Sequence, residues 1–246
     1  KRLFRNEEAD KKSGRKFLQS AHSSLFTLTA REHGKESLLY VDSRSGWGTV
    51  SAHAGANVHT LTFSDHAVLC GATVILTAVT GIDSISWTVR LHSENKQYTL
   101  YECDYPVLSF GACNKTKVFF PYGCGEVYPA SRTFETKQNY PSYGASMQYM
   151  ALWHAGAERG IYYGLHDPAP AYKKLFYKKS EGEKVACMKA TMPLRDIDMP
   201  CNSQTLEGEA VWELFDGDWY DAALIYKKFF EEHASWKPEI KDGKRA

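Results

Sequence analysis

Apolar and polar residues alternate along much of the chain, and this alternation predicts short β-strands. The pattern is clearest in residues 84–93, SISWTVRLHS, where Ile85, Trp87, Val89 and Leu91 point one way and polar residues the other. A period of two over this length is typical of a strand with one buried and one solvated face. Similar segments occupy residues 22–32, 57–65, 72–81, 96–110, 117–123, 160–168 and 183–194.

The connections between these segments indicate the fold class. Clusters of Gly, Pro, Asn, Asp and Ser separate them, and helical patterns do not alternate with the strands. This arrangement favours a mainly β chain, an antiparallel sandwich or barrel, over a parallel α/β sheet. Residues 144–156, GASMQYMALWHAG, fit either a short helix or a strand that is apolar on both faces. We favour the strand.

Residues 217–236, GDWYDAALIYKKFFEEHASW, have a different period. Trp219, Ala222, Tyr226 and Phe229 recur at the three-then-four spacing of one helical face. Asp218 precedes the first turn as an N-cap residue would, and Lys237-Pro238 follows the pattern as a stop signal. We therefore predict a C-terminal amphipathic helix. Because no further core-forming segment follows it here, we expect its aromatic face to be buried by a second domain.

The charge of the chain and the length of its apolar stretches narrow the class of protein. With 30 basic and 29 acidic residues the formal net charge is +1, which does not suit a nucleic-acid-binding protein. Residues 1–20 carry charges of both signs and are interpreted as a solvated N-terminal arm. The longest apolar stretch, residues 66–82, is interrupted by Gly71 and by threonines, so we expect no membrane span.

Cysteines and one tripeptide point to an oxidising compartment. The chain has 6 cysteines, and Cys103, Cys113, Cys124, Cys187 and Cys201 are candidates for disulfide bonds whose pairing the sequence leaves open. A bridge between Cys187 and Cys201 would close a loop of about fifteen residues, worth about 3 kcal/mol in the chain-entropy model. Asn114-Lys115-Thr116 is an acceptor for N-glycosylation. Together these features favour a secreted or extracellular protein, with a lysosomal one as the alternative.

Catalytic motifs do not appear in the sequence. It has no nucleophile elbow, phosphate-binding loop, dinucleotide fingerprint or zinc-protease motif. The nine histidines are scattered, so we expect neither a metal nor another cofactor. The carboxylates considered for sugar chemistry are Asp104, Asp167, Asp216 and Asp218, and none forms a recognisable acid and base pair. The residues alone predict no catalytic residue and therefore a non-catalytic sandwich.

Three places are candidates for contact with a carbohydrate. Residues 119–129 contain Tyr122 and Gly123 in a turn rich in glycine and proline, and residues 164–174 place His166 and Asp167 at the end of a strand. Trp47 lies between glycines in an apparent loop, where an exposed ring would be free to stack on a sugar. Each has an ordinary structural alternative as a turn or core residue.

Four segments in fixed order resemble a known family. They are residues 87–110 (WTVRLHSENKQYTLYECDYPVLSF), 118–128 (VFFPYGCGEVY), 140–168 (YPSYGASMQYMALWHAGAERGIYYGLHDP) and 214–236 (LFDGDWYDAALIYKKFFEEHASW). This order resembles the N-terminal part of large glycoside-hydrolase-related proteins that contain a domain of unknown function. In them, a β-sandwich of the galactose-mutarotase-like kind leads through a helix into a (β/α)8 barrel.

The resemblance implies a super-sandwich at residues 21–215 and, at 216–246, a helix linking to a barrel beyond Ala246 or in a partner chain. Catalytic carboxylates would then lie on that barrel. Two functions remain open: the sandwich part of an extracellular glycoside hydrolase that acts on glycan, or a stand-alone extracellular module that binds carbohydrate or has a structural role. A free-standing mutarotase would need a histidine acid and a carboxylate base in one cleft.

Overall fold

The computed structural model describes residues 24–238, 240–241 and 244–245. Most of these residues form two antiparallel sheets. The smaller sheet contains β1 (Thr27–Glu32), β2 (Leu38–Asp42), β7 (Tyr98–Gly111), β10 (Phe134–Tyr140), β13 (Lys173–Lys179) and β14 (Val185–Pro193). The larger sheet contains β3 (Trp47–Ala54), β4 (Val58–His66), β5 (Ala72–Thr80), β6 (Ser84–Ser93), β8 (Thr116–Phe120), β9 (Glu126–Pro129), β11 (Tyr149–His154), β12 (Arg159–His166), β15 (Ser203–Thr205) and β16 (Glu209–Asp216).

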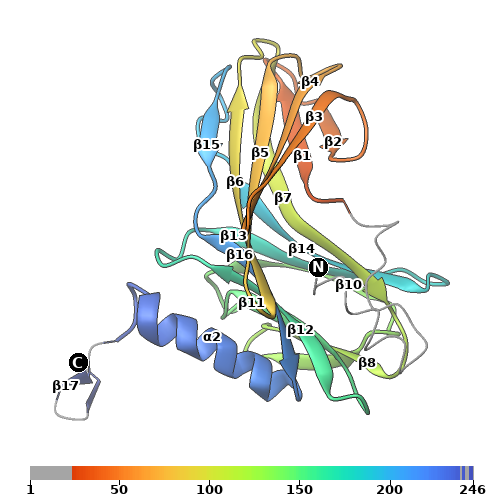
Figure 1. Cartoon of the computed structure of the whole chain (residues 1–246), viewed down its shortest axis with the longest axis vertical. Helices are drawn as coiled ribbons and strands as arrows, with labels where there is room; N and C mark the ends of the chain where they lie inside the picture. The colour runs from red at the N-terminus through yellow and green to blue at the C-terminus, as the bar shows by residue number, and fades with distance from the viewer. Residues whose placement is uncertain (1–23, 239, 242–243, 246) are drawn as a thin grey trace.

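The two sheets face each other as a sandwich, which confirms the predicted fold class (Figure 1). The strand order is β10-β13-β14-β7-β1-β2 in the smaller sheet and β3-β4-β5-β6-β16-β12-β11-β8-β9 in the larger, with β15 on β6. The helix α2 (Trp219–His233) follows β16, and a ribbon of β17 (Ile240–Lys241) and β18 (Lys244–Arg245) comes after it. The predicted arm at residues 1–20 lies outside the described residues.

The core between the sheets follows the predicted alternation. In β5, Ala72, Val74, Leu76 and Ala78 are buried, whereas the residues between them are more exposed. In β6 the same holds towards the end of the strand, where Val89 and Leu91 are buried. Period-two alternation therefore places one side of these strands in the core.

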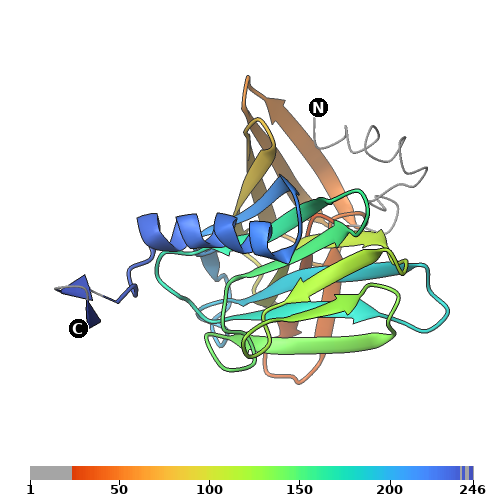
Figure 2. The same ribbon diagram turned by 90° about the horizontal axis from the view of Figure 1, so that it is seen from below.

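The central strands of the larger sheet are buried on both faces. Residues 144–156, which fitted a helix or a strand, contain the strand β11, whose first five residues are all buried. Met150 and Leu152 face the smaller sheet, while Tyr149 and Ala151 belong to a second apolar cluster on the opposite face. A strand in this position needs a second cover, and α2 lies across this outer face (Figure 2).

The helix begins where the sequence predicts and ends earlier. Asp218 is the N-cap, and its side chain and that of Asp221 form a reciprocal capping box. The helix ends at His233 rather than near Lys237-Pro238, because the backbone becomes extended at Ala234 and Ser235 bonds to the Pro168 carbonyl.

The expectation that another domain buries the aromatic face of this helix was wrong. Ala222, Tyr226 and Phe229 are buried in the cluster that also contains Tyr149 and Tyr162 of the sheet. The aromatic face therefore has its partner within this chain. The sequence pattern could not reveal this, because the outer faces of β11 and β12 look like ordinary core positions.

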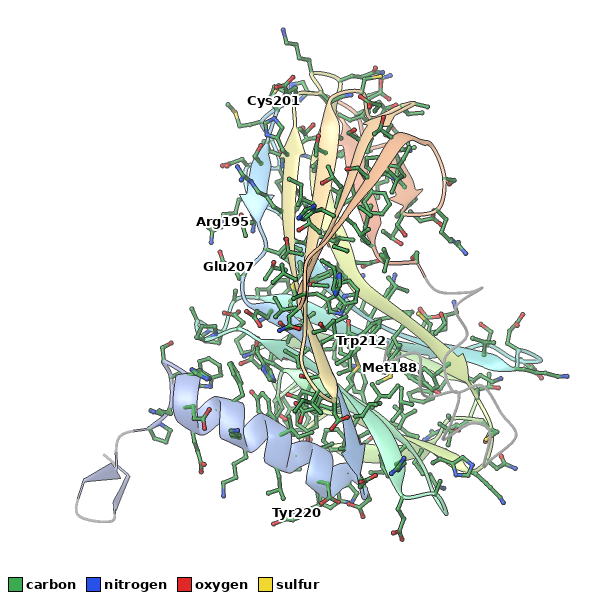
Figure 3. The ribbon with its side chains drawn as sticks, viewed as in Figure 1. Met188, Arg195, Cys201, Glu207, Trp212 and Tyr220 are labelled. Carbon is green, nitrogen blue, oxygen red and sulfur yellow. The ribbon has the colours of Figure 1, made fainter. Side chains whose placement is uncertain are left out.

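The proposed disulfide bridges do not form. In the described part of the chain the free thiols are Cys70, Cys103, Cys124, Cys187 and Cys201, and the Cys113 sulfur lies 3.3 Å from Thr116 Oγ1. Cys187 is in β14 next to Met188, whereas Cys201 lies far from it at the other end of the sandwich (Figure 3). Cys103 is enclosed in the core, where burial raises the pKa of its thiol. An even number of cysteines does not bring them together in space.

Candidate functional site

The first candidate loop follows β12 and is wound around one carboxylate. Asp167 Oδ1 accepts a hydrogen bond from the Ala169 amide at 2.9 Å, and Oδ2 accepts one from the Ala171 amide at 2.7 Å. The Asp167 side chain therefore shapes the turn after the strand, which is a common role for aspartate. Its carboxylate points inward and is only 2% exposed.

A buried lysine meets this carboxylate. Lys173, at the start of β13, is 0% exposed, and its Nζ lies 2.8 Å from Asp167 Oδ2 and 2.6 Å from Gln148 Oε1. The same ammonium lies 5.0 Å from the centre of the Tyr140 ring. Gln148 Nε2 donates to the backbone carbonyl of Asp167 at 3.0 Å, so the three residues form a closed buried network. Burial lowers the pKa of Lys173, and Asp167 opposes that shift.

The network continues to α2. The Tyr226 side chain of the helix interacts with Tyr140 and Gln148. Burial raises the pKa of both tyrosines, so both hydroxyls remain protonated at neutral pH. The loop after β12, the start of β13 and the helix are thereby joined through polar contacts within an apolar surround.

His166 is the second link between the sheet and the helix. Its ring stacks on Phe229 with the centroids 4.2 Å apart and the planes 8° apart, and Nε2 lies 2.8 Å from the Tyr162 hydroxyl. Burial, helped by His233, lowers the pKa of His166 to about 4. The imidazole is therefore neutral at physiological pH and serves to dock the helix. With His166 and Asp167 both occupied, this end of β12 holds an anchor rather than an acid and base pair.

The second candidate loop, residues 121–125, lies at the same end of the sheet. Gly123 has a φ of +56° and donates its amide to the Tyr143 carbonyl, and the Tyr122 ring lies 5.6 Å from the Tyr143 ring. The Ser146 amide bonds to the Pro121 carbonyl, and the Leu165 amide bonds to the Gln148 carbonyl. The chain leading into β11 therefore separates the two candidate loops. Tyr122 is 37% exposed and Tyr143 75%, so both rings reach solvent.

Trp47 lies apart from these loops, on the edge strand β3. Its indole Nε1 donates to the Asp42 carbonyl at 2.9 Å, and its ring packs edge-on against Phe26 and Phe63. The ring is half-buried against the core cluster. The structure thus brings four of the five predicted contact residues to one end of the sheet and places Trp47 elsewhere.

Tyr140, Gln148 and Lys173 were missed by sequence reasoning. One signal for Lys173 is available in the sequence: it shares its parity along β13 with the buried Leu175 and Tyr177. A lysine at an inward position needs a buried partner, and Asp167 supplies it. In the part of the chain that is described, no group of three or more His, Cys, Asp or Glu residues could hold a metal ion, and no helix is long and apolar enough to cross a membrane.

Comparison with known proteins supports the resemblance seen in the sequence. No family model matches the chain. A protein of Monosiga brevicollis, named as a candidate glycoside hydrolase, is 27% identical over 150 residues, which cover 59% of this chain and 12% of that protein. The chain therefore spans only a small part of this relative's length.

Solved structures share the fold at low sequence identity. The α-N-acetylgalactosaminidase NagBb of Bifidobacterium bifidum, in complex with GalNAc, has a TM-score of 0.64 and 12% identity, covering 86% of this chain and 34% of that one. An α-galactosidase of Lactobacillus brevis has a TM-score of 0.50 and 11% identity, covering 85% and 29%. The chain thus has the galactose-mutarotase-like sandwich fold of the N-terminal domains of such glycoside hydrolases, which confirms the resemblance.

The buried ion pair generates a stability prediction. Lys173→Met should lower the free energy of unfolding by about 3–5 kcal/mol, because Asp167 would remain buried without its counter-charge. The matched control is Lys178→Met in the same strand, whose exposed pair with Glu135 at 2.8 Å should contribute less than about 1 kcal/mol. Urea unfolding of both variants measures the difference, and equal losses would contradict this account of the network.

The lowered pKa of His166 predicts that the stability of the folded chain depends on pH. Its pKa is about 4 in the folded chain against an ordinary value of 6.5, so only the unfolded chain takes up this proton between those pH values. Stability should therefore fall as the pH falls through that window, with His166 contributing a loss on the order of 1–2 kcal/mol between pH 7 and pH 5.

The contribution can be isolated with two variants. His166→Phe keeps an aromatic ring against Phe229 and should show a shallower loss of stability between pH 7 and pH 5. His33→Gln changes an exposed histidine away from the helix and should keep the original slope. Unfolding curves at a series of pH values provide the measurement, and a wild-type slope in His166→Phe would show that His166 does not titrate in this way.

Proposed function

We propose that this chain is the non-catalytic β-sandwich portion of an extracellular glycoside-hydrolase-like protein and supports a carbohydrate-active (β/α)8 barrel in the same polypeptide or in a partner chain. The fold supports the proposal, since it is shared with glycoside hydrolases of which this chain covers about a third. Fold alone does not assign a function, so the side chains must also be considered.

The carboxylates in the described residues support a non-catalytic role. Asp104 bonds to Lys189 and to Thr191, Asp167 lies within the buried network, and Asp216 pairs with Arg159. Asp218 caps the helix. A glycosidase needs two carboxyl groups on opposite sides of a scissile bond, and each of these four already has a structural role.

The outward side of α2 supports the proposal most directly. Tyr220 is 57% exposed and Leu224, one turn further along, is 43% exposed, although the helix has already buried its aromatic face on the sandwich. Exposed apolar residues gathered on one side of an element are typical of a contact surface. We propose that this side of α2 packs against the barrel, and that Tyr122 and Tyr143 are the sandwich residues that reach towards bound glycan.

The alternative is a stand-alone carbohydrate-binding module. The exposed pair of Tyr122 and Tyr143 favours it, because aromatic faces stack on sugar rings. Trp47 favours it less, since its ring is packed against the core. A free-standing mutarotase is not supported, because His166 is enclosed by Phe229 and Tyr162 and Asp167 is held by Lys173.

The proposed extracellular location rests on the acceptor at Asn114. Asn114 is exposed in the loop between β7 and β8, where an oligosaccharide transferase would find it on the surface. The cysteines lend no support, since the expected bridges do not form. Occupancy of Asn114 by a glycan in native material would support the proposed location.

A hydrolysis assay separates the two functions. Native protein from the source and the 246-residue chain alone would be compared on p-nitrophenyl α-galactoside and p-nitrophenyl α-N-acetylgalactosaminide, the sugars named in the similar structures. We expect hydrolysis by the native protein and none by the chain alone, because Asp104, Asp167, Asp216 and Asp218 are all engaged in structural contacts.

Two results would contradict the proposal. Hydrolysis by the 246-residue chain alone would make the sandwich catalytic. A native mass of 27.8 kDa plus one glycan, with binding on a glycan array and no hydrolysis, would favour the stand-alone module instead. In that case Tyr143→Ala should abolish glycan binding, whereas Tyr40→Ala, which removes another exposed ring on β2, should leave it unchanged.

A further inference from the structure

The described edge strands of the two sheets differ in how they are protected against pairing with another chain. Edge strands expose a row of unpaired amides and carbonyls, and proteins usually protect them with charges, proline or short length. At one end of the larger sheet, β9 has only 4 residues and ends in Pro129. In the smaller sheet, the edge strand β10 carries Glu135 and Lys137, and the edge strand β2 has 5 residues and ends at Asp42.

The remaining edge, β3, has none of these protections. It has 8 residues, pairs only with β4 in the described structure, and its residues after Trp47 are all exposed. Residues 47–64, which span β3 and most of β4, contain no Lys, Arg, Asp, Glu or Pro. The β3–β4 hairpin projects beyond the body of the sandwich, so nothing described in the chain covers this edge (Figure 2).

The inner side of this hairpin continues into an apolar hollow. A groove of about 770 Å³ lies over the ends of β3 to β6, and Leu61, Leu76, Ile85 and Trp87 are among the residues that line it. On β3, Val50 pairs with the buried Phe63 and therefore faces the same side, and it is 55% exposed. A strand added to β3 would extend this apolar side of the sheet.

We propose that β3 pairs with β3 of a second copy of this chain, in an antiparallel arrangement about a two-fold axis. When a two-fold axis relates two copies of one edge strand, the contact is isologous, which means that the same residues contribute from both chains. A register centred on Ser51 places Val50 opposite Ala52 on the groove side and Thr49 opposite His53 on the outer side, so the pleats of the two strands match.

The absence of charge favours a second copy as the occupant. Because residues 47–64 are uncharged apart from any protonation of His53 and His59, two copies can approach along this edge without like-charge repulsion. The chain as a whole carries only a formal +1 charge, so long-range repulsion is also small. This contact does not depend on the proposed function, since α2 and the 121–125 loop lie on other strands of the sheet.

Light scattering after size-exclusion chromatography tests the proposal on the 246-residue chain. The wild-type chain should elute as a dimer of two 27.8 kDa chains and dissociate on dilution. Val50→Lys should weaken the dimer and raise its dissociation constant by about tenfold or more, because charges that point inward from an edge strand oppose pairing. The matched control is Val58→Lys on the neighbouring strand β4, which is 46% exposed and should leave the dimer intact.

Hydrogen exchange in the β3 amides completes the test. These amides should be protected in the wild-type dimer and in Val58→Lys, and exposed in Val50→Lys, while circular dichroism shows that all three remain folded. A wild-type chain that stays monomeric overturns the proposal, whether β3 exchanges freely or is protected by another part of the chain such as residues 1–23. A dimer that persists in Val50→Lys, or is lost in Val58→Lys, also overturns it.

Discussion

The burial of the aromatic face of α2 against β11 and β12 is the contact on which the rest of this structure depends. Tyr149 and Tyr162 are fully buried large side chains, yet they point away from the smaller sheet. Without the helix they would lie on an open sheet face. The burial of Tyr226 and Phe229 in the same contact contributes about 1.5–3 kcal/mol of stability for each side chain. The sandwich is therefore a structure of three layers in which the helix is a necessary part.

The same contact determines what the loops at this end of the sheet can do. His166 is held between Tyr162 and Phe229, and Tyr226 interacts with Gln148 of the network that contains Lys173 and Asp167. These groups fulfil one another's hydrogen-bonding needs inside the protein, so they hold the loop after β12 rather than act on a substrate. Of the residues predicted to contact carbohydrate at this end, Tyr122 has an exposed ring, and the exposed ring of Tyr143 lies beside it.

Much of the fold was predictable from the sequence, because strands and helix caps depend on local patterns. Alternation identified β5 and β6, and Asp218 was correctly placed at the start of the helix. The partner of the helix was not predictable, since the outer residues of β11 resemble those of any core strand. Lys173 was missed although its parity matched that of Leu175, and the cysteine count misled because Cys187 and Cys201 lie at different ends of the sandwich.

Two faces of α2 differ in their contacts. One face is buried on the sandwich and stabilises it, and we propose that the exposed side supports another domain. The aromatic face itself needs no second domain for its burial: that is the central claim. Native-state hydrogen exchange on the 246-residue chain tests that claim, because protection reports the free energy of local opening.

The amides of Ala222, Tyr226 and Phe229 should then be protected to nearly the same free energy as those of β11 and β12. The helix would in that case open only when the sandwich itself unfolds. Exchange of these amides at the rate of a frayed segment, with β11 and β12 still protected, would contradict the account. It would mean that the aromatic face of the helix needs a second domain to bury it.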